Sequence, residues 1–207
     1  MSIFSDARFR GYSLSAGRPV ATADLSYDDP GGLYAAISGS TVLGADDAIK
    51  PLGLQLNGGY AKRLPSDLTI DFGVIHSEYS HYSSAESANS YTEVYAGVTH
   101  KFLTARAAFS PHYFEAGART FYAEVDANVS AGGKLHFSGH LGLLVPISSG
   151  DAIEAFRPQH DWRLGARREF GRASLHVIAT GGGPGRDYYR DRYRSRTAVT
   201  FGLSYAL

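Results

Sequence analysis

The sequence predicts an all-β fold: a single up-and-down antiparallel transmembrane β-barrel of about 12 strands, in one domain that covers residues 1–207. Three observations predict it. Apolar and polar residues alternate along the predicted segments, which is the period-two pattern of strands whose two faces meet different surroundings. Short and long connections follow each other along the chain. Tyr, Phe and Trp gather near the segment ends, as in the aromatic girdles of membrane barrels.

The most regular alternation occurs in residues 121–129 and 135–143, which we expect to form a hairpin around the turn 131–134. One parity of both segments is apolar and the other is polar. On the polar parity we expect four titratable side chains to lie side by side across the two strands: Glu124, Asp126, His136 and His140.

The other predicted strands repeat this pattern in chain order. In the first, residues 4–14, the charged side chains share one parity, while Ala7 and Phe9 share the other. In the following segments Leu, Ile, Val, Ala and aromatic residues occupy one parity, and mostly Thr, Ser, Asp, Glu, Arg or His the other. These segments are 21–27, 33–40, 52–60, 68–77, 91–98, 103–109, 161–167, 173–177 and 199–205.

Short connections are expected at residues 28–31, 64–67, 101–102, 131–134 and 169–172, and most of the others are longer. Asp28-Asp29-Pro30-Gly31 is a strong turn signal. Short turns at one end and long loops at the other are typical of outer-membrane barrels. An even strand count with both termini on the short-turn side closes the ring and leaves no edge strand.

Alternation by itself also fits a water-soluble β-barrel or sandwich, in which the apolar parity would face inward. Two features favour the membrane type. The apolar parity carries almost no charge near the segment centres. In addition, side chains fill an eight-stranded barrel but not a much wider one, so a soluble ring of this size would enclose a large apolar void. We therefore expect the apolar parity to face lipid and the polar parity to face the lumen.

Composition narrows the remaining possibilities. The 20 basic and 20 acidic residues balance, so the chain has no electrostatic footprint of a nucleic-acid-binding protein. It has no Cys, which excludes disulfides and thiolate metal sites. No apolar run approaches the roughly 20 residues of a membrane-spanning helix. Residues 1–6 lack the features of a signal peptide, so either the chain is cytoplasmic or the numbering is that of a mature or recombinant form. We expect the second, with the protein in the bacterial outer membrane.

Three motifs resemble those of a known family. Residues 5–13 are similar to the opening SD-x-x-FRG-x-S of the TorF-type porins, also known as the Gcw_chp proteobacterial family. Residues 91–97 resemble the YTEVY-x-G motif of that family, and residues 110–114 resemble its SP-x-YF motif. The resemblance implies an outer-membrane barrel and a porin-like role, without an established substrate.

The polar parity supplies the candidate functional residues. We interpret it as the lining of a narrow, charged lumen that admits small polar or ionic solutes by passive passage. Asp6 and Asp161 share this parity. The predicted lumen-lining residues are Arg8, Arg10, Asp24, Asp71, Glu93, Tyr95, Arg106, Glu124, Asp126, His136, His140, Arg163, Arg167 and His176.

Two alternatives stay open. The mixed charges could instead pair with one another and hold the barrel shut, leaving a structural or interaction barrel. Its external loops, residues 145–160 and 181–196, would then bind a partner protein, and the Arg and Tyr residues of the second loop also suit lipopolysaccharide phosphates. Outer-membrane lipid is the expected partner of the apolar face in either case.

The second alternative is an outer-membrane lipid hydrolase, with Ser138, His136, His140 and Glu124 as its catalytic set. These residues share the lumen parity, whereas lipid hydrolysis needs access to the lipid side. The chain also has no G-x-S-x-G elbow. We therefore expect no enzymatic activity and no cofactor. A metal ion on the pair His136 and His140 is less expected than a hydrogen-bonded pair.

Overall fold

The computed structural model describes residues 1–44, 46, 48–80, 90–114, 118–147, 158–183 and 197–206. Its regular elements are all strands. In chain order they are β1 (Ser2–Phe4), β2 (Arg8–Phe9), β3 (Tyr12–Ser13), β4 (Val20–Asp28), β5 (Leu33–Leu43), β6 (Ile49–Arg63), β7 (Leu68–Tyr79), β8 (Ser90–His100), β9 (Leu103–Ser110), β10 (Thr120–Ser130), β11 (Leu135–Pro146), β12 (Gln159–Phe170), β13 (Ala173–Gly183) and β14 (Ala198–Tyr205).

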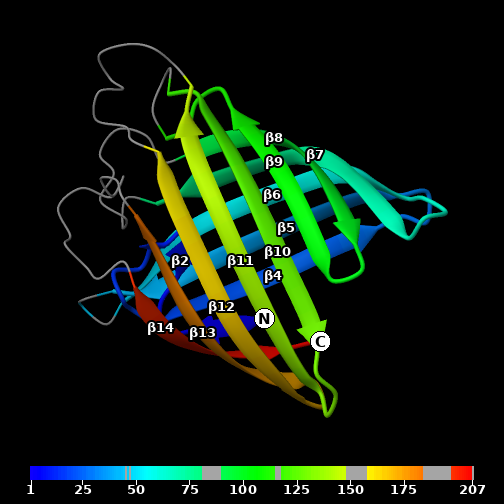
Figure 1. The fold of residues 1–207 in the computed structure, drawn as a ribbon. Helices are drawn as coiled ribbons and strands as arrows, with labels where there is room; N and C mark the ends of the chain where they lie inside the picture. The colour runs from blue at the N-terminus through cyan, green and yellow to red at the C-terminus, as the bar shows by residue number, and fades with distance from the viewer. Residues whose placement is uncertain are drawn as a thin grey trace.

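Twelve of these strands, β1 and β4–β14, close into one barrel in which each strand is antiparallel to its neighbours (Figure 1). Sequence neighbours pair from β4 to β14, and β1 closes the ring between β14 and β4. The predicted fold class and strand number are therefore confirmed. The two termini lie together, because the Met1 amino group donates a hydrogen bond to the Tyr205 carbonyl at 3.0 Å.

The five predicted short turns are also present. They connect β4 to β5, β6 to β7, β8 to β9, β10 to β11 and β12 to β13. In the first of them the Asp29 carboxylate accepts a hydrogen bond from the backbone N–H of Gly31 at 2.8 Å, the local bond expected of Asp in a tight turn. All five turns lie at the same end of the barrel, since successive strands run in opposite directions.

The apolar parity faces outward, except at Leu52, which is 1% exposed and lies inside the barrel beside a register shift between β5 and β6. Leu25, Leu164 and Phe201 are 72%, 62% and 60% exposed, whereas Glu93 and Asp161 on the polar parity are 3% and 6% exposed. An apolar outer wall around a polar interior is the arrangement of a transmembrane β-barrel. Exposed aromatic residues lie close to the short turns, as expected of an interfacial girdle: Tyr27, Phe102, Phe170 and Tyr205. Among the described residues, no helix is long and apolar enough to cross a membrane.

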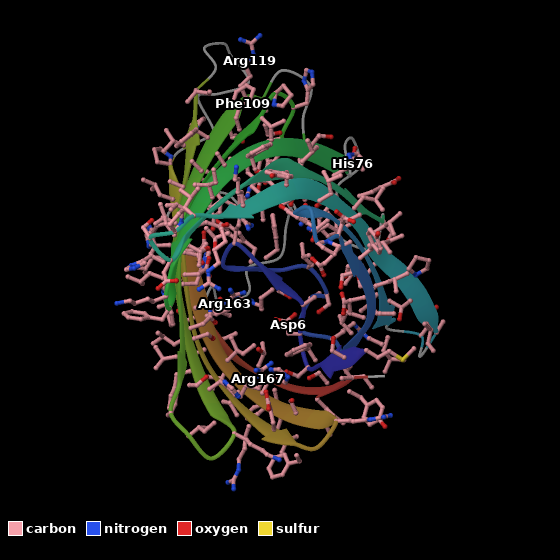
Figure 2. The ribbon with its side chains drawn as sticks, turned by 90° about the vertical axis from the view of Figure 1, so that its right-hand side faces the viewer. Asp6, His76, Phe109, Arg119, Arg163 and Arg167 are labelled. Atoms are coloured by element: carbon pink, nitrogen blue, oxygen red, sulfur yellow. The ribbon has the colours of Figure 1, made fainter. Side chains whose placement is uncertain are left out.

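The predicted first strand, residues 4–14, is wrong. Only β1 belongs to the wall, and residues 5–19, here called the lumen segment, turn into the ring and carry the small β2–β3 sheet (Figure 2). The backbone has positive φ at Arg10 (45°), Gly11 (82°), Ala16 (57°) and Gly17 (71°), so the chain reverses twice and cannot continue as a strand. Figure 2 shows Asp6 inside the ring of strands.

The buried core lies inside the barrel, where the lumen segment meets the wall. Leu14 packs into it from the segment, and Ala7 and Phe9 pack against it rather than facing outward. Most wall residues of this core come from strand ends opposite the short turns. The lumen segment therefore fills the half of the barrel remote from the short turns. The core residues are Leu14, Val20, Val42, Leu52, Tyr79, Tyr91, Tyr95, Ala108, Tyr113, Phe114, Tyr122 and Leu144.

Candidate channel lumen

A cavity of about 560 Å³ lies between the lumen segment and the barrel wall. Most of the predicted lumen-lining residues border it, although two of them come from the lumen segment rather than from the wall. Those on the segment are Arg8 and Arg10, and those on the wall are Glu93, Tyr95, Arg106, Glu124, Asp126, His140 and Arg163. Their part in solute passage stays a prediction.

The remaining predicted residues lie elsewhere in the barrel. His136, Arg167 and His176 border a smaller hollow of about 270 Å³ near the short turns. Asp24 on β4 is exposed and accepts a hydrogen bond from Ser38 Oγ on β5 at 2.7 Å. Asp71 belongs to a network with tyrosine and arginine that is described below.

Asp6 organises the lumen segment. Its Oδ1 atom accepts hydrogen bonds from Ser13 Oγ at 2.5 Å, from Ser15 Oγ at 2.7 Å and from the Gly17 N–H at 3.1 Å. Its Oδ2 atom lies 3.4 Å from Arg8 Nη1. Hydrogen bonds to a carboxylate are stronger than those between neutral groups, so this side chain fixes the second reversal, at Ala16 and Gly17, against the start of the segment. Asp6 and Ser13 are two of the residues that carry the family resemblance.

Arg10 attaches the lumen segment to the wall. Its Nη2 atom lies 2.9 Å from both carboxylate oxygens of Glu93 on β8. The guanidinium carbon lies 3.7 Å from the ring centroid of Tyr122 and 5.2 Å from that of Tyr113. The side chains of Arg10 and Glu93 are only 10% and 3% exposed. Removing one partner of a buried ion pair leaves an uncompensated charge, which makes this contact a strong attachment.

A second network of polar side chains runs along the inner surface of the wall, from β5 to β10. The Tyr34 hydroxyl donates to Asp71 Oδ1 at 2.6 Å and also hydrogen-bonds the Tyr95 hydroxyl. Arg106 lies between two carboxylates, with Nη2 at 3.4 Å from Asp71 and Nη1 at 3.7 Å from Glu124. Its guanidinium also lies over the Tyr95 ring at 4.5 Å. These contacts tie five strands together through their polar side chains.

A third network centres on His140, which lies directly opposite Asp126 in the β10–β11 register. His140 Nδ1 lies 2.9 Å from Asp126 Oδ1, and Nε2 lies 2.9 Å from Asp161 Oδ1 on β12. The Tyr122 hydroxyl donates to Asp161 Oδ2 at 3.0 Å. Arg163 Nη2 lies 3.5 Å from Asp126.

The four residues considered as a catalytic set do not come together. Glu124 and His140 belong to the networks just described, while His136 contacts other residues. His136 Nδ1 lies 3.0 Å from Ser130 Oγ, and its Nε2 lies 3.1 Å from Glu169 Oε1 at an angle that does not make a hydrogen bond. Ser138 lies between the two histidines on the same face of β11, opposite Asn128, and among the described residues no hydrogen bond joins it to either of them.

The tyrosines that join these networks were mostly missed at the level of sequence. Tyr34, Tyr95 and Tyr122 share the polar parity, but only Tyr95 was among the predicted lumen residues. A large hydroxyl-bearing ring on a polar parity is a usable signal, because a buried Tyr usually places its hydroxyl against a hydrogen-bond partner. The predicted partner loops, 145–160 and 181–196, lie largely outside the described residues.

Comparison with known proteins gives a family and a fold. A family model described as "Bacterial protein of unknown function (Gcw_chp)" matches residues 1–182. No curated protein matches the sequence. Among solved structures, the NanC porin is similar with a TM-score of 0.65 at 10% identity, over 100% of this chain and 99% of that one. The KdgM porin is similar with a TM-score of 0.59 at 11% identity, over 100% and 99% of the two chains. At these identities the likeness concerns the fold.

Proposed function

This chain belongs to the Gcw_chp family of bacterial proteins of unknown function, and we propose that it is an outer-membrane channel for passive passage of small polar or ionic solutes. The observation that carries the proposal is a cavity lined by charged side chains inside a closed barrel whose outer wall is apolar. Charged rings and clusters along a lumen select solutes by sign and size.

The lining supports small solutes rather than a polymer of one charge. Acidic and basic side chains alternate around the cavity and pair with one another, so neither sign dominates the wall. One structure of the KdgM porin is described as in complex with disordered oligogalacturonate. Because the carboxylates of Glu124 and Asp126 interrupt the basic side chains of this lining, it offers such a polyanion no uniformly positive path, which favours a different solute class here.

The lumen segment narrows the proposed route. Residues 5–19 occupy the half of the barrel remote from the short turns, and their core packing leaves the water-accessible space beside them. We expect a small single-channel conductance for this reason, set by the gap between the segment and the charged wall.

Single-channel recording in planar lipid bilayers tests this function. We expect discrete conductance steps from the intact protein. Asp24→Asn should shift the reversal potential in a salt gradient toward anion preference, because Asp24 is an exposed lumen carboxylate with one neutral partner. Asp67→Asn, in a short turn outside the lumen, is the matched control. A folded barrel that shows no conductance at any voltage would exclude a channel.

A second candidate is a closed structural barrel that binds a partner protein through its external loops. The buried core around the lumen segment favours it, because such packing stabilises a closed state. Deletion of residues 148–157 and 184–196 separates the two functions. Loss of a captured partner with an unchanged, non-conducting barrel would support this candidate. The same deletions test contact of the second loop with lipopolysaccharide.

A further inference from the structure

We propose that Glu124, Asp126 and His140 form a binding site for one divalent transition-metal ion on the lumen wall. Each residue offers one ligand atom, and these atoms lie within 4.8 Å of one another. Two donors on opposite sides of one ion are about 4.2 Å apart when each bond is about 2.1 Å long. Small side-chain rotations are therefore enough to bring the three donors around an ion.

The strands place these donors on one face. Glu124 and Asp126 are two residues apart on β10, so both point inward, and His140 lies opposite Asp126 on β11. The pairing of the two strands therefore places all three donors on one side of a possible ion site. The same side chains border the cavity, which gives the ion a path of entry and leaves room for water at its remaining coordination positions.

A further carboxylate contacts the ring nitrogen of His140 that faces away from Asp126. Asp161 Oδ1 lies 2.9 Å from His140 Nε2, and Asp161 is 6% exposed. A carboxylate on the far nitrogen of a ligating histidine fixes the tautomer and the ring orientation, and it raises the basicity of the other nitrogen. Here it leaves Nδ1, the atom that faces Asp126, to bind the metal. The Tyr122 hydroxyl in turn orients Asp161.

The cations around the site leave it accessible. Arg106 and Arg163 make long contacts of 3.7 Å to Glu124 and 3.5 Å to Asp126, and the Arg163 side chain is 50% exposed. Both can turn toward other partners, because Arg106 also contacts Asp71 and Arg163 reaches water. Arg10 is held by Glu93 and does not occupy this position.

The donor set indicates the class of ion. One imidazole nitrogen with two carboxylate oxygens suits Zn²⁺, Mn²⁺, Co²⁺ or Ni²⁺ better than Ca²⁺ or Mg²⁺, which prefer oxygen ligands alone. We choose Zn²⁺ as the probe for affinity and Co²⁺ as the probe for position. Neither measurement depends on whether the barrel conducts.

Calorimetric titration of the full chain, folded in detergent and stripped with a chelator, tests the site. We expect one Zn²⁺ per chain. His140→Gln should abolish this binding, and Asp161→Asn should weaken it by about 10–100-fold without changing the stoichiometry. Asp161→Glu should restore part of the affinity. His136→Gln, an inward histidine on the same strand that contacts Ser130 and Glu169, is the matched control and should bind as the unaltered protein does.

Trp162 reports where the ion binds. It is the single tryptophan of the chain, follows Asp161 and lies opposite Leu141, next to His140. Co²⁺ should quench its fluorescence with a saturable curve that His140→Gln removes. If His140→Gln does not fold, Glu124→Gln carries the same test and should weaken Zn²⁺ binding at least tenfold. No saturable binding by the unaltered protein, or equal binding after these substitutions, would overturn the proposal.

Discussion

At the scale of single residues, Asp6 shows how one buried carboxylate shapes a segment. It accepts hydrogen bonds from Ser13, Ser15 and Gly17, in addition to the backbone bonds of the β2–β3 sheet. Ser15 Oγ in addition accepts from the Ala7 N–H at 3.0 Å. The lumen segment is therefore stabilised by local polar contacts as well as by its apolar packing.

We predict that Asp6→Asn loosens residues 5–19 while the barrel wall stays folded. An amide cannot accept the same set of charge-assisted bonds, and the local free energy of opening should fall by about 2–4 kcal/mol. Hydrogen exchange of the segment amides measures this change. Asp29→Asn is the matched control, because it makes the same change at an Asp that accepts a backbone N–H in a short turn, and it should leave the segment protected. Equal protection in both variants would contradict the role of Asp6.

At the scale of elements, the lumen segment also depends on close backbone contact with β13. A Cβ atom on Gly11 would lie 2.9 Å from the Gly181 carbonyl oxygen and 2.9 Å from Gly182 Cα. These neighbours are backbone atoms, which cannot move aside as a flexible side chain can. Gly11 in addition has a φ of +82°, a conformation that residues with a side chain rarely adopt.

We predict that Gly11→Ala displaces the β2–β3 sheet from the wall. Gly132→Ala is the matched control, because Gly132 also has positive φ (+78°), but a Cβ atom there would meet nothing within 4 Å. Both changes carry the strain of a left-handed conformation, about 1–2 kcal/mol. Only Gly11→Ala should raise hydrogen exchange in residues 5–19. Similar exchange in both variants would mean that the contact with β13 does not hold the segment.

The ion pair between Arg10 and Glu93 is the other attachment of this element. Glu93→Gln leaves the Arg10 guanidinium buried without its counter-charge, which costs about 3–5 kcal/mol. We predict that the lumen segment then leaves its place and single-channel conductance rises. Arg63→Ala breaks an exposed pair with Asp67, worth about 0–1 kcal/mol, and should leave conductance unchanged. A Glu93→Gln channel with the original conductance would show that the segment does not limit the passage.

The lumen segment is also the element that the sequence did not predict. Residues 4–14 alternate well enough to resemble a wall strand, and Phe9 falls on the apolar parity. Period two shows that a stretch is extended, but not which surface it meets. The signal that was available lies in Gly11 and Gly17, whose positions suit reversals, and in the hydroxyl residues spaced around Asp6. The wall strands were predictable because two signals indicate the same strand in each case: turn residues at its ends and one parity without charges along its length.

At the scale of the whole molecule, both the proposed channel and the proposed metal site require that the polar face of the sheet lines the lumen and the apolar face contacts lipid. Pairing register could be inferred for the hairpin of β10 and β11, which is why Asp126 and His140 could be expected to be neighbours. The contacts of His140 with Asp161 and of Arg10 with Glu93 could not. The first depends on the register of β11 against β12, which the long connection between them leaves unspecified in the sequence, and the second depends on the inward course of residues 5–19. Long-range side-chain contacts of this kind follow from the closed ring rather than from any local pattern.

Adjacent residues on β13 test the orientation directly. Val177 is 47% exposed and belongs to the apolar outer wall, while His176 points inward and hydrogen-bonds Ser204 Oγ at 2.8 Å. Val177→Arg places a charge against hydrocarbon, so the free energy of unfolding in lipid vesicles should fall by about 2–4 kcal/mol. His176→Arg, at the same depth on the opposite face, should change it by much less, because the new charge meets a hydrated lumen. Urea titration of the folded barrel in vesicles measures both values. If His176→Arg were the more destabilising of the two, lipid would have to contact the polar face, and neither the channel nor the lumen metal site could exist.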